Sequence, residues 1–174
     1  LPAQPRNMNR QMAVASGVRL VIDYSHNVDG MRNLADFVRR MVEPPAVPGA
    51  QKAGSGASRG RAIGVIGIPG DRRDQDQHDY GYLAAGAFDE LVVREDRNLR
   101  GRKPGETAGN VVAGVRAART KGEAVTTRVE TILDEAAAVR TAIRRAVPGD
   151  LVVCCVDDAV GVYRLANELL GVPG

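Results

Sequence analysis

The stretch V-R-L-V-I-D-Y-S-H-N-V-D-G, residues 18–30, decides the fold. It opens with a short apolar run of Val, Leu and Ile that is typical of one buried strand, and this run stops at Asp23. Apolar residues then recur at helical spacing on one face between Met31 and Met41. A buried strand that leads directly into an amphipathic helix is the first half of a parallel βαβ unit. The stretch therefore predicts an open α/β sheet.

The same alternation of strand and helix patterns continues along the whole chain. Strands are predicted at residues 18–23, 62–68, 89–94, 126–132 and 151–156, with helices at 28–42, 76–87, 104–120, 134–146 and 160–170. A weaker strand at 10–15 joins the first strand through a Ser16-Gly17 turn, which predicts an antiparallel edge. The pattern predicts a three-layer, Rossmann-like α/β fold with a mostly parallel sheet of about six strands.

The composition indicates an ordinary globular protein of one domain. Of the 174 residues, 44% are apolar and 26% are charged, and the low aromatic content of 3% implies a core of Val, Leu, Ile and Ala. No run approaches the ~20 apolar residues that span a bilayer, so no membrane contact is expected. No signal peptide is visible at the polar start, and the missing initiator Met suggests a piece of a longer chain. Residues 44–60 are rich in Pro, Gly and Ser and are predicted to form a mobile loop.

Cysteine and histidine content narrows the chemistry further. Cys154 and Cys155 are adjacent in a predicted strand, so they point to opposite faces, cannot easily pair, and suit a reducing cytoplasm. His26 and His78 are the only histidines, and neither has a second ligand nearby in sequence, so no metal site is predicted. No G-x-x-x-x-G-K-[ST] motif occurs, so the chain cannot by itself form a phosphate-binding P-loop.

Four predicted strand ends are rich in polar residues, namely 23–27, 70–74, 94–103 and 157–158. The carboxyl ends of parallel strands lie at one edge of a sheet, where ligands bind in α/β folds. These residues therefore predict a binding crevice, although the alternation of strands and helices does not identify its ligand. His26 is the better histidine for function, while a structural hydrogen-bonding role is nearly as consistent with its place. The segment 94–103 is basic but has no aromatic residue, and the net charge is only +3, which argues against nucleic-acid binding.

Several segments resemble one family. D-Y-S-H-N at 23–27, G-D-R-R-D at 70–74 and F-D-E-L-V-V-R-E-D-R-N-L-R-G-R-K-P-G-E at 88–106 are similar to the C-terminal domain of the Mur ligase superfamily, most of all to its cyanophycin synthetases. P-R-N-M-N at 5–9 resembles the entry to that domain, and the resemblance covers nearly the whole chain. One departure is Val28, which replaces the proline that usually follows the asparagine.

The resemblance implies part of an ATP-dependent ligase that adds an amino acid, with arginine favoured, to a carboxylate through an acyl phosphate. ATP and Mg would be bound mostly by a central ATPase domain of the same polypeptide, so the fragment alone would be inactive. The full-length form could be a homo-oligomer. In the matching positions Asp23 would contact the ATP ribose. His26, the catalytic candidate, and Asn27 would lie near the phosphate and the incoming amino acid.

The resemblance also implies a site for the amino acid. Arg72 or Arg73 would hold its α-carboxylate, and Glu95 and Asp96 would face its guanidinium group. Asp71 and Arg94, which stand beside them in the sequence, are further substrate-binding candidates. The alternative for the second group is a solvated cluster of charges that pair with one another. For the chain as a whole, the alternatives are a non-catalytic nucleotide-binding or regulatory α/β module and a basic nucleic-acid-binding module.

Overall fold

The computed structural model describes residues 10–43 and 59–171, with side chains from residue 16 onward. The P-R-N-M-N segment and nearly all of the predicted loop at 44–60 lie outside the described residues. The strands are β1 (Arg10–Ala15), β2 (Val18–Asp23), β3 (Ala62–Ile66), β4 (Glu90–Val93), β5 (Arg128–Thr131) and β6 (Leu151–Cys155). The helices are α1 (Val28–Val42), α2 (Asp74–Ala85), α3 (Glu106–Thr120), α4 (Glu135–Arg145) and α5 (Ala159–Leu170).

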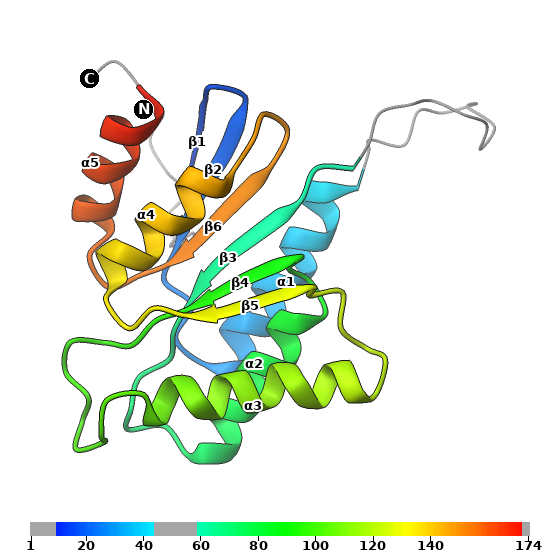
Figure 1. The fold of residues 1–174 in the computed structure, drawn as a ribbon, viewed down its shortest axis with the longest axis vertical. Coiled ribbons are helices and arrows are strands. Elements are labelled where there is room, and N and C mark those ends of the chain that lie inside the picture. Colours follow the sequence, from blue (N-terminus) through cyan, green and yellow to red (C-terminus); the bar gives the residue numbers. More distant parts are fainter. Residues whose placement is uncertain (1–9, 44–58, 172–174) are drawn as a thin grey trace.

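The described strands form one sheet in the order β1-β2-β6-β3-β4-β5 (Figure 1). Only β1 and β2 pair in antiparallel fashion, and every other neighbouring pair is parallel. The predicted Rossmann-like fold with one antiparallel edge strand is therefore confirmed. Helix starts differ from the prediction by two residues at two places. The helix predicted from 76 starts at Asp74, and the one predicted from 104 starts at Glu106, after Gly105 at φ 85°.

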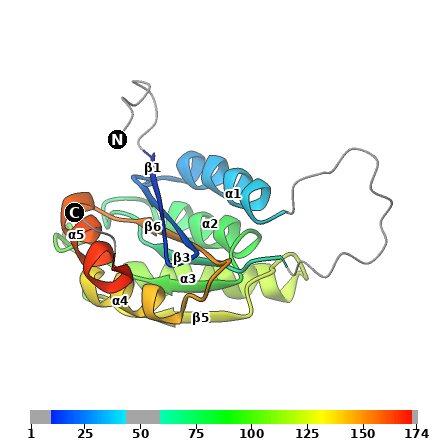
Figure 2. The same cartoon turned by 90° about the horizontal axis from the view of Figure 1, so that it is seen from above.

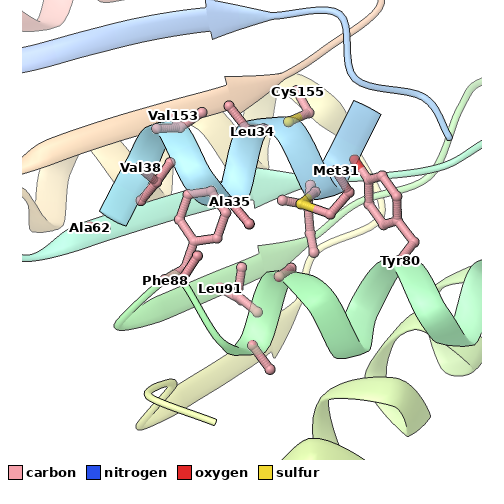
Figure 3. Packing of buried hydrophobic residues seen from close by; sticks show 14 of the residues in the cluster. Met31, Leu34, Ala35, Val38, Ala62, Tyr80, Phe88, Leu91, Val153 and Cys155 are labelled. Atoms are coloured by element: carbon pink, nitrogen blue, oxygen red, sulfur yellow. The ribbon is translucent and has the colours of Figure 1, made fainter. Parts of the chain in front are cut away.

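The helices cover both faces of the sheet, as Figures 1 and 2 show. Helices α1, α2 and α3 contribute to one buried cluster of apolar side chains, and α4 and α5 to a second. Figure 3 shows how α1 packs on the sheet, with Met31, Leu34 and Val38 close to Val153 and Cys155 of β6. Strand residues alternate between the two clusters because successive side chains point to opposite faces. Cys154 and Cys155 follow this rule. Cys155 is buried in the first cluster and Cys154 in the second, and they form no disulfide.

Helices α2 and α3 cross at very short range. A Cβ added to Gly114 would lie 1.9 Å from the carbonyl oxygen of His78, and one added to Gly81 would lie 2.0 Å from that of Val111. Both positions therefore require glycine for packing, because backbone of the facing helix occupies the space that a side chain would need.

Candidate functional site

Two hollows open at the carboxyl ends of the parallel strands, where the sequence predicts a binding crevice. The larger, of about 610 Å³, lies among the loop after β4 and the starts of α4 and α5, and we call it the acid-lined cavity. Its acidic residues are Glu95, Asp96, Asp134, Glu135, Asp157 and Asp158, and its basic residues are Arg97, Arg100 and Arg140. The smaller, of about 300 Å³, lies between the starts of α1 and α2, and we call it the α1–α2 hollow.

Arg94 lies at the centre of the strand ends and is only 3% exposed. Its Nε and Nη2 donate to the carbonyl oxygen of Cys155 at the end of β6, at 3.2 and 2.9 Å. Its Nη1 donates to the Asp96 carboxylate and lies 3.5 Å from Glu135 and 3.6 Å from Asp157. The alternative of a solvated charge cluster is therefore wrong for Arg94. The guanidinium group is buried and links β4 to β6 and α4.

Gly67 makes this link possible, because β3 lies between β4 and β6 in the sheet. A Cβ added to Gly67 would lie 2.7 Å from Nε of Arg94 and 2.9 Å from its Cζ. The guanidinium group therefore crosses the end of β3 through the space that a missing side chain leaves.

Four of the six acidic residues in the cavity accept hydrogen bonds from backbone N–H groups. Both carboxylate oxygens of Glu95 accept bonds at the start of α3, from Gly105 and Ala108 at 2.9 Å each. Asp134 and Asp158 cap α4 and α5 through bonds of 2.8 Å each. Glu135 accepts bonds from backbone N–H groups in the loop between β6 and α5. Glu95, which was predicted to face the substrate, lines the cavity and also holds the start of α3.

Asp96 and Asp157 are the two acidic residues of the cavity whose carboxylates accept no backbone bond within the described part of the chain. The Asp157 side chain is 51% exposed, and that of Asp96 is 11% exposed. Burial raises the pKa of the Asp96 carboxyl, Arg94 opposes this shift, and the negative charge of Asp157 adds to it. Because three carboxylates surround one guanidinium group, this corner of the cavity carries excess negative charge and suits a cation.

The α1–α2 hollow contains two of the other predicted residues, Asn27 and Arg72. The side-chain oxygen of Asn27 caps α1 by accepting a bond from Gly30 at 2.7 Å, which leaves its amide nitrogen as a donor. Nε of Arg72 is buried without a hydrogen-bond partner among the described residues. Asn27 and Arg72 thus bring N–H groups to the lining of this hollow, together with the carboxylates of Asp29 and Asp76, which pair with Arg32 and Arg73.

The remaining predicted residues lie nearby. Asp71 pairs with Arg100 at 3.3 Å, and the largely exposed Arg73 pairs with Asp76 at 2.7 Å. Asp23 is buried at the end of β2. Nδ1 of His26 lies 2.8 Å from the carbonyl oxygen of Tyr24, so Nδ1 carries the proton of a neutral ring.

The arrangement therefore separates the predicted substrate residues into two places. Arg72 lies in the α1–α2 hollow and Asp96 in the acid-lined cavity, and the two hollows share no lining residue. Glu135 was not predicted, because Asp-Glu before an apolar helical pattern is typical of an ordinary helix start. The polar end of β6 was noticed, but nothing in the sequence placed Asp157 beside Arg94.

Two kinds of site are absent from the described ranges. No group of three or more His, Cys, Asp or Glu side chains there could hold a metal ion. Within the same ranges, no helix is both long and apolar enough to cross a membrane.

Comparison with known proteins identifies the family. The sequence profile described as "Mur ligase, glutamate ligase domain" matches residues 9–156. The chain belongs to this family. The cyanophycin synthetase of Synechocystis sp. is 37% identical over 133 residues, which is 76% of this chain and 13% of that protein. The cyanophycin synthetase of Crocosphaera subtropica is 31% identical over 148 residues, which is 85% of this chain and 14% of that protein.

Solved structures agree on the fold of this Mur ligase domain. A UDP-N-acetylmuramoyl-L-alanyl-D-glutamate–2,6-diaminopimelate ligase superposes with a TM-score of 0.66 at 18% identity, and the match covers 97% of this chain and 32% of that one. The predicted membership is thus confirmed by the sequence profile and the predicted fold by the structural match. The chain spans only about one seventh of the cyanophycin synthetases that it matches.

Proposed function

We propose that this chain is the C-terminal domain of an ATP-dependent ligase that joins the amine of a cationic amino acid, with arginine favoured, to a carboxylate. The observation that carries the proposal is the pair Asp96 and Asp157 in the acid-lined cavity of a Mur ligase domain. Arg94 offsets only one of the three negative charges around it. A guanidinium group brought by the substrate would offset another and could donate to the carboxylates of Asp96 and Asp157, which accept no backbone bond.

The reaction would proceed in two steps. Transfer of the γ-phosphoryl group of ATP to the acceptor carboxylate forms an acyl phosphate and releases ADP. The amine of the amino acid then attacks the carbonyl carbon, so that the C–N bond forms, the bond from this carbon to the phosphate oxygen breaks, and the amine loses a proton. In this scheme the domain holds the amine substrate in place and supplies charges, which lowers the entropic cost of the second step.

The α1–α2 hollow would face the anionic groups of the reactants. Asn27 and Arg72 offer N–H donors there, and Asp23 would contact the ribose as the family resemblance implies. Because Nδ1–H of His26 is already bonded to Tyr24, its ring could donate to a phosphate only from Nε2, and therefore only as the doubly protonated imidazolium. Such a charged ring would stabilise negative charge on the phosphate.

Partners and location follow from the same proposal. The phosphate-binding loop and the Mg²⁺ ligands would come from a central domain of the same polypeptide. The two buried thiols are consistent with a reducing cytoplasm. The basic segment 94–103 supports nucleic-acid binding poorly, because Arg94 is buried, Arg100 pairs with Asp71, and Arg102 pairs with Asp74 and Glu106.

The cation site is tested by Asp157→Asn in the full-length enzyme. The variant removes one charged acceptor from the substrate, and a hydrogen bond to a charged group contributes about 1.5–3 kcal/mol. We therefore expect the KM for arginine to rise about 10- to 150-fold while the KM for ATP stays unchanged. Steady-state kinetics with each substrate varied in turn measures both.

The neighbouring variant Asp158→Asn is the matched control. It removes the same unit charge from the same loop, but Asn is as good a helix cap as Asp, so the start of α5 is kept. Its KM for arginine should change by no more than about twofold, as expected of an exposed charge that makes no contact with the substrate. Equal effects of the two substitutions, or none from Asp157→Asn, would contradict the proposed cation site.

A further inference from the structure

A hydrogen-bonded bridge connects the start of α4 to the end of β6. The two carboxylate oxygens of Glu135 accept bonds from the backbone N–H groups of Asp157 and Asp158, at 2.9 and 3.1 Å. Glu135 is the first residue of α4, whereas its partners lie in the loop between β6 and α5. The bridge therefore joins two elements that are 22 residues apart along the chain.

The electrostatics show why the loop needs such a bridge. The carboxylates of Asp96, Glu135 and Asp157 all lie around Nη1 of Arg94. Like charges at this range repel, and the Asp157 side chain, which is half exposed, could relax by turning to solvent. Within the described residues its carboxylate accepts no hydrogen bond from the backbone. Apart from the contact with Arg94, the direction of this side chain therefore depends on how its own backbone is held.

We propose that Glu135 is a positioning residue of the cation site: it fixes the backbone of Asp157 and Asp158 so that the Asp157 carboxylate stays beside Asp96 at the Arg94 corner of the acid-lined cavity. This inference rests on the proposed function. Both oxygens of Glu135 accept backbone bonds, and Oε2 also lies 3.5 Å from Nη1 of Arg94, so this carboxylate has less acceptor capacity left for a substrate cation than that of Asp157. Its contribution reaches the substrate only through Asp157.

The substitution Glu135→Gln tests whether Glu135 acts through its two backbone hydrogen bonds. The amide can accept only one of the two N–H bonds, and its own NH₂ group would face the other N–H. In the full-length enzyme we expect the KM for arginine to rise about 10-fold, the lower end of the losses found when a residue that orients a metal ligand is replaced. The KM for ATP should not change. Glu135→Asp, which keeps the charge but is one methylene shorter, should act in the same direction and replaces the Gln variant if that one fails to fold.

The control Asp134→Asn matches the charge change. Asp134 precedes Glu135, lines the same cavity and caps α4 through Ala137, a bond that Asn retains. Its KM for arginine should stay within about twofold of the parent, as expected of a charge change without a lost contact. An equal rise in Asp134→Asn and Glu135→Gln would overturn the proposal, because the effect would then come from charge alone.

A double-mutant cycle gives the decisive result. If Glu135 acts through Asp157, Glu135→Gln should raise the KM for arginine little further once Asp157 is Asn. Additive effects would overturn the positioning role while leaving the cation site intact, whereas no effect of Asp157→Asn would reject the cation site itself. As a readout without turnover, the backbone amides of Asp157 and Asp158 should exchange with solvent faster in Glu135→Gln, and unchanged exchange would also overturn the proposal.

Discussion

Replacing Gly114 with alanine is expected to destabilise the protein by about 3 kcal/mol or more, at the upper end of the effects of overpacking. The added methyl group would lie 1.9 Å from the carbonyl oxygen of His78 and 2.8 Å from the backbone nitrogen of Tyr82. Both are backbone atoms of α2, so no rotation of a side chain can relieve the overlap. Urea denaturation followed by circular dichroism should show a large fall in the transition midpoint.

Gly109 provides the matched control in the same helix. It also lies in α3, but a Cβ added there would have no atom within 4 Å. Gly109→Ala should raise stability by about 0.5–1 kcal/mol, because alanine loses less backbone entropy in a helix than glycine does. The two substitutions are chemically identical and should change the stability of the protein in opposite directions. Equal stability of Gly114→Ala and the parent would mean that α2 and α3 are not in such close contact.

The second large effect is expected for Arg94→Met, which should cost about 3–5 kcal/mol because it leaves buried charges without their partner. Asp96, Glu135 and Asp157 would then repel one another, and the carbonyl oxygen of Cys155 would lose two N–H donors. Methionine keeps most of the volume, so the loss reports charge and hydrogen bonding rather than a cavity. Urea denaturation at neutral pH measures the difference.

The pH dependence of this variant has a defined sign. Without Arg94 the pKa of the Asp96 carboxyl should rise further, since burial and Asp157 already raise it and only Arg94 opposes them. A carboxyl whose pKa is raised on folding destabilises the native state while it is ionised, and this penalty disappears as pH falls through the raised value. The deficit of Arg94→Met should therefore be smaller at mildly acidic pH than at neutral pH.

Arg140→Met is the control for the same cavity. Arg140 lines the cavity but makes no ion pair or hydrogen bond within the described residues. Its substitution should change stability by no more than about 0.5 kcal/mol, the usual range for such positions. A similar deficit in both variants would show that the Arg94 contacts do not hold the strand ends together.

The sequence predicted the fold well because its pattern is local. Each strand and each helix has its own apolar period, and Ser16-Gly17 marks the hairpin between β1 and β2. The order of the strands is not local. Nothing in the period of residues 151–156 shows that β6 inserts between β2 and β3, and this insertion brings Asp157 to Arg94.

The candidate site was predicted less completely for the same reason. Asp96 was found because it follows a strand end, but Glu95 beside it turns to cap α3 through a contact 13 residues away. Arg94 was expected to face a ligand, whereas the missing side chain at Gly67 lets it turn inward to Cys155. Such contacts depend on the direction in which each side chain of a loop points, and residue type alone does not determine that direction.

The adjacent cysteines offer separate reporters for the two layers of helices. Cys154 is buried between the sheet and helices α4 and α5, and Cys155 is buried on the other face, under α1, α2 and α3. Burial raises the pKa of the Cys154 thiol, so the native protein should react with alkylating reagents only after a layer opens. In two variants that each keep one cysteine, the labelling rate would measure how often each layer lifts from the sheet. Because the two sulfurs are one residue apart, a difference in rate would reflect the covering helices and not the position along the strand.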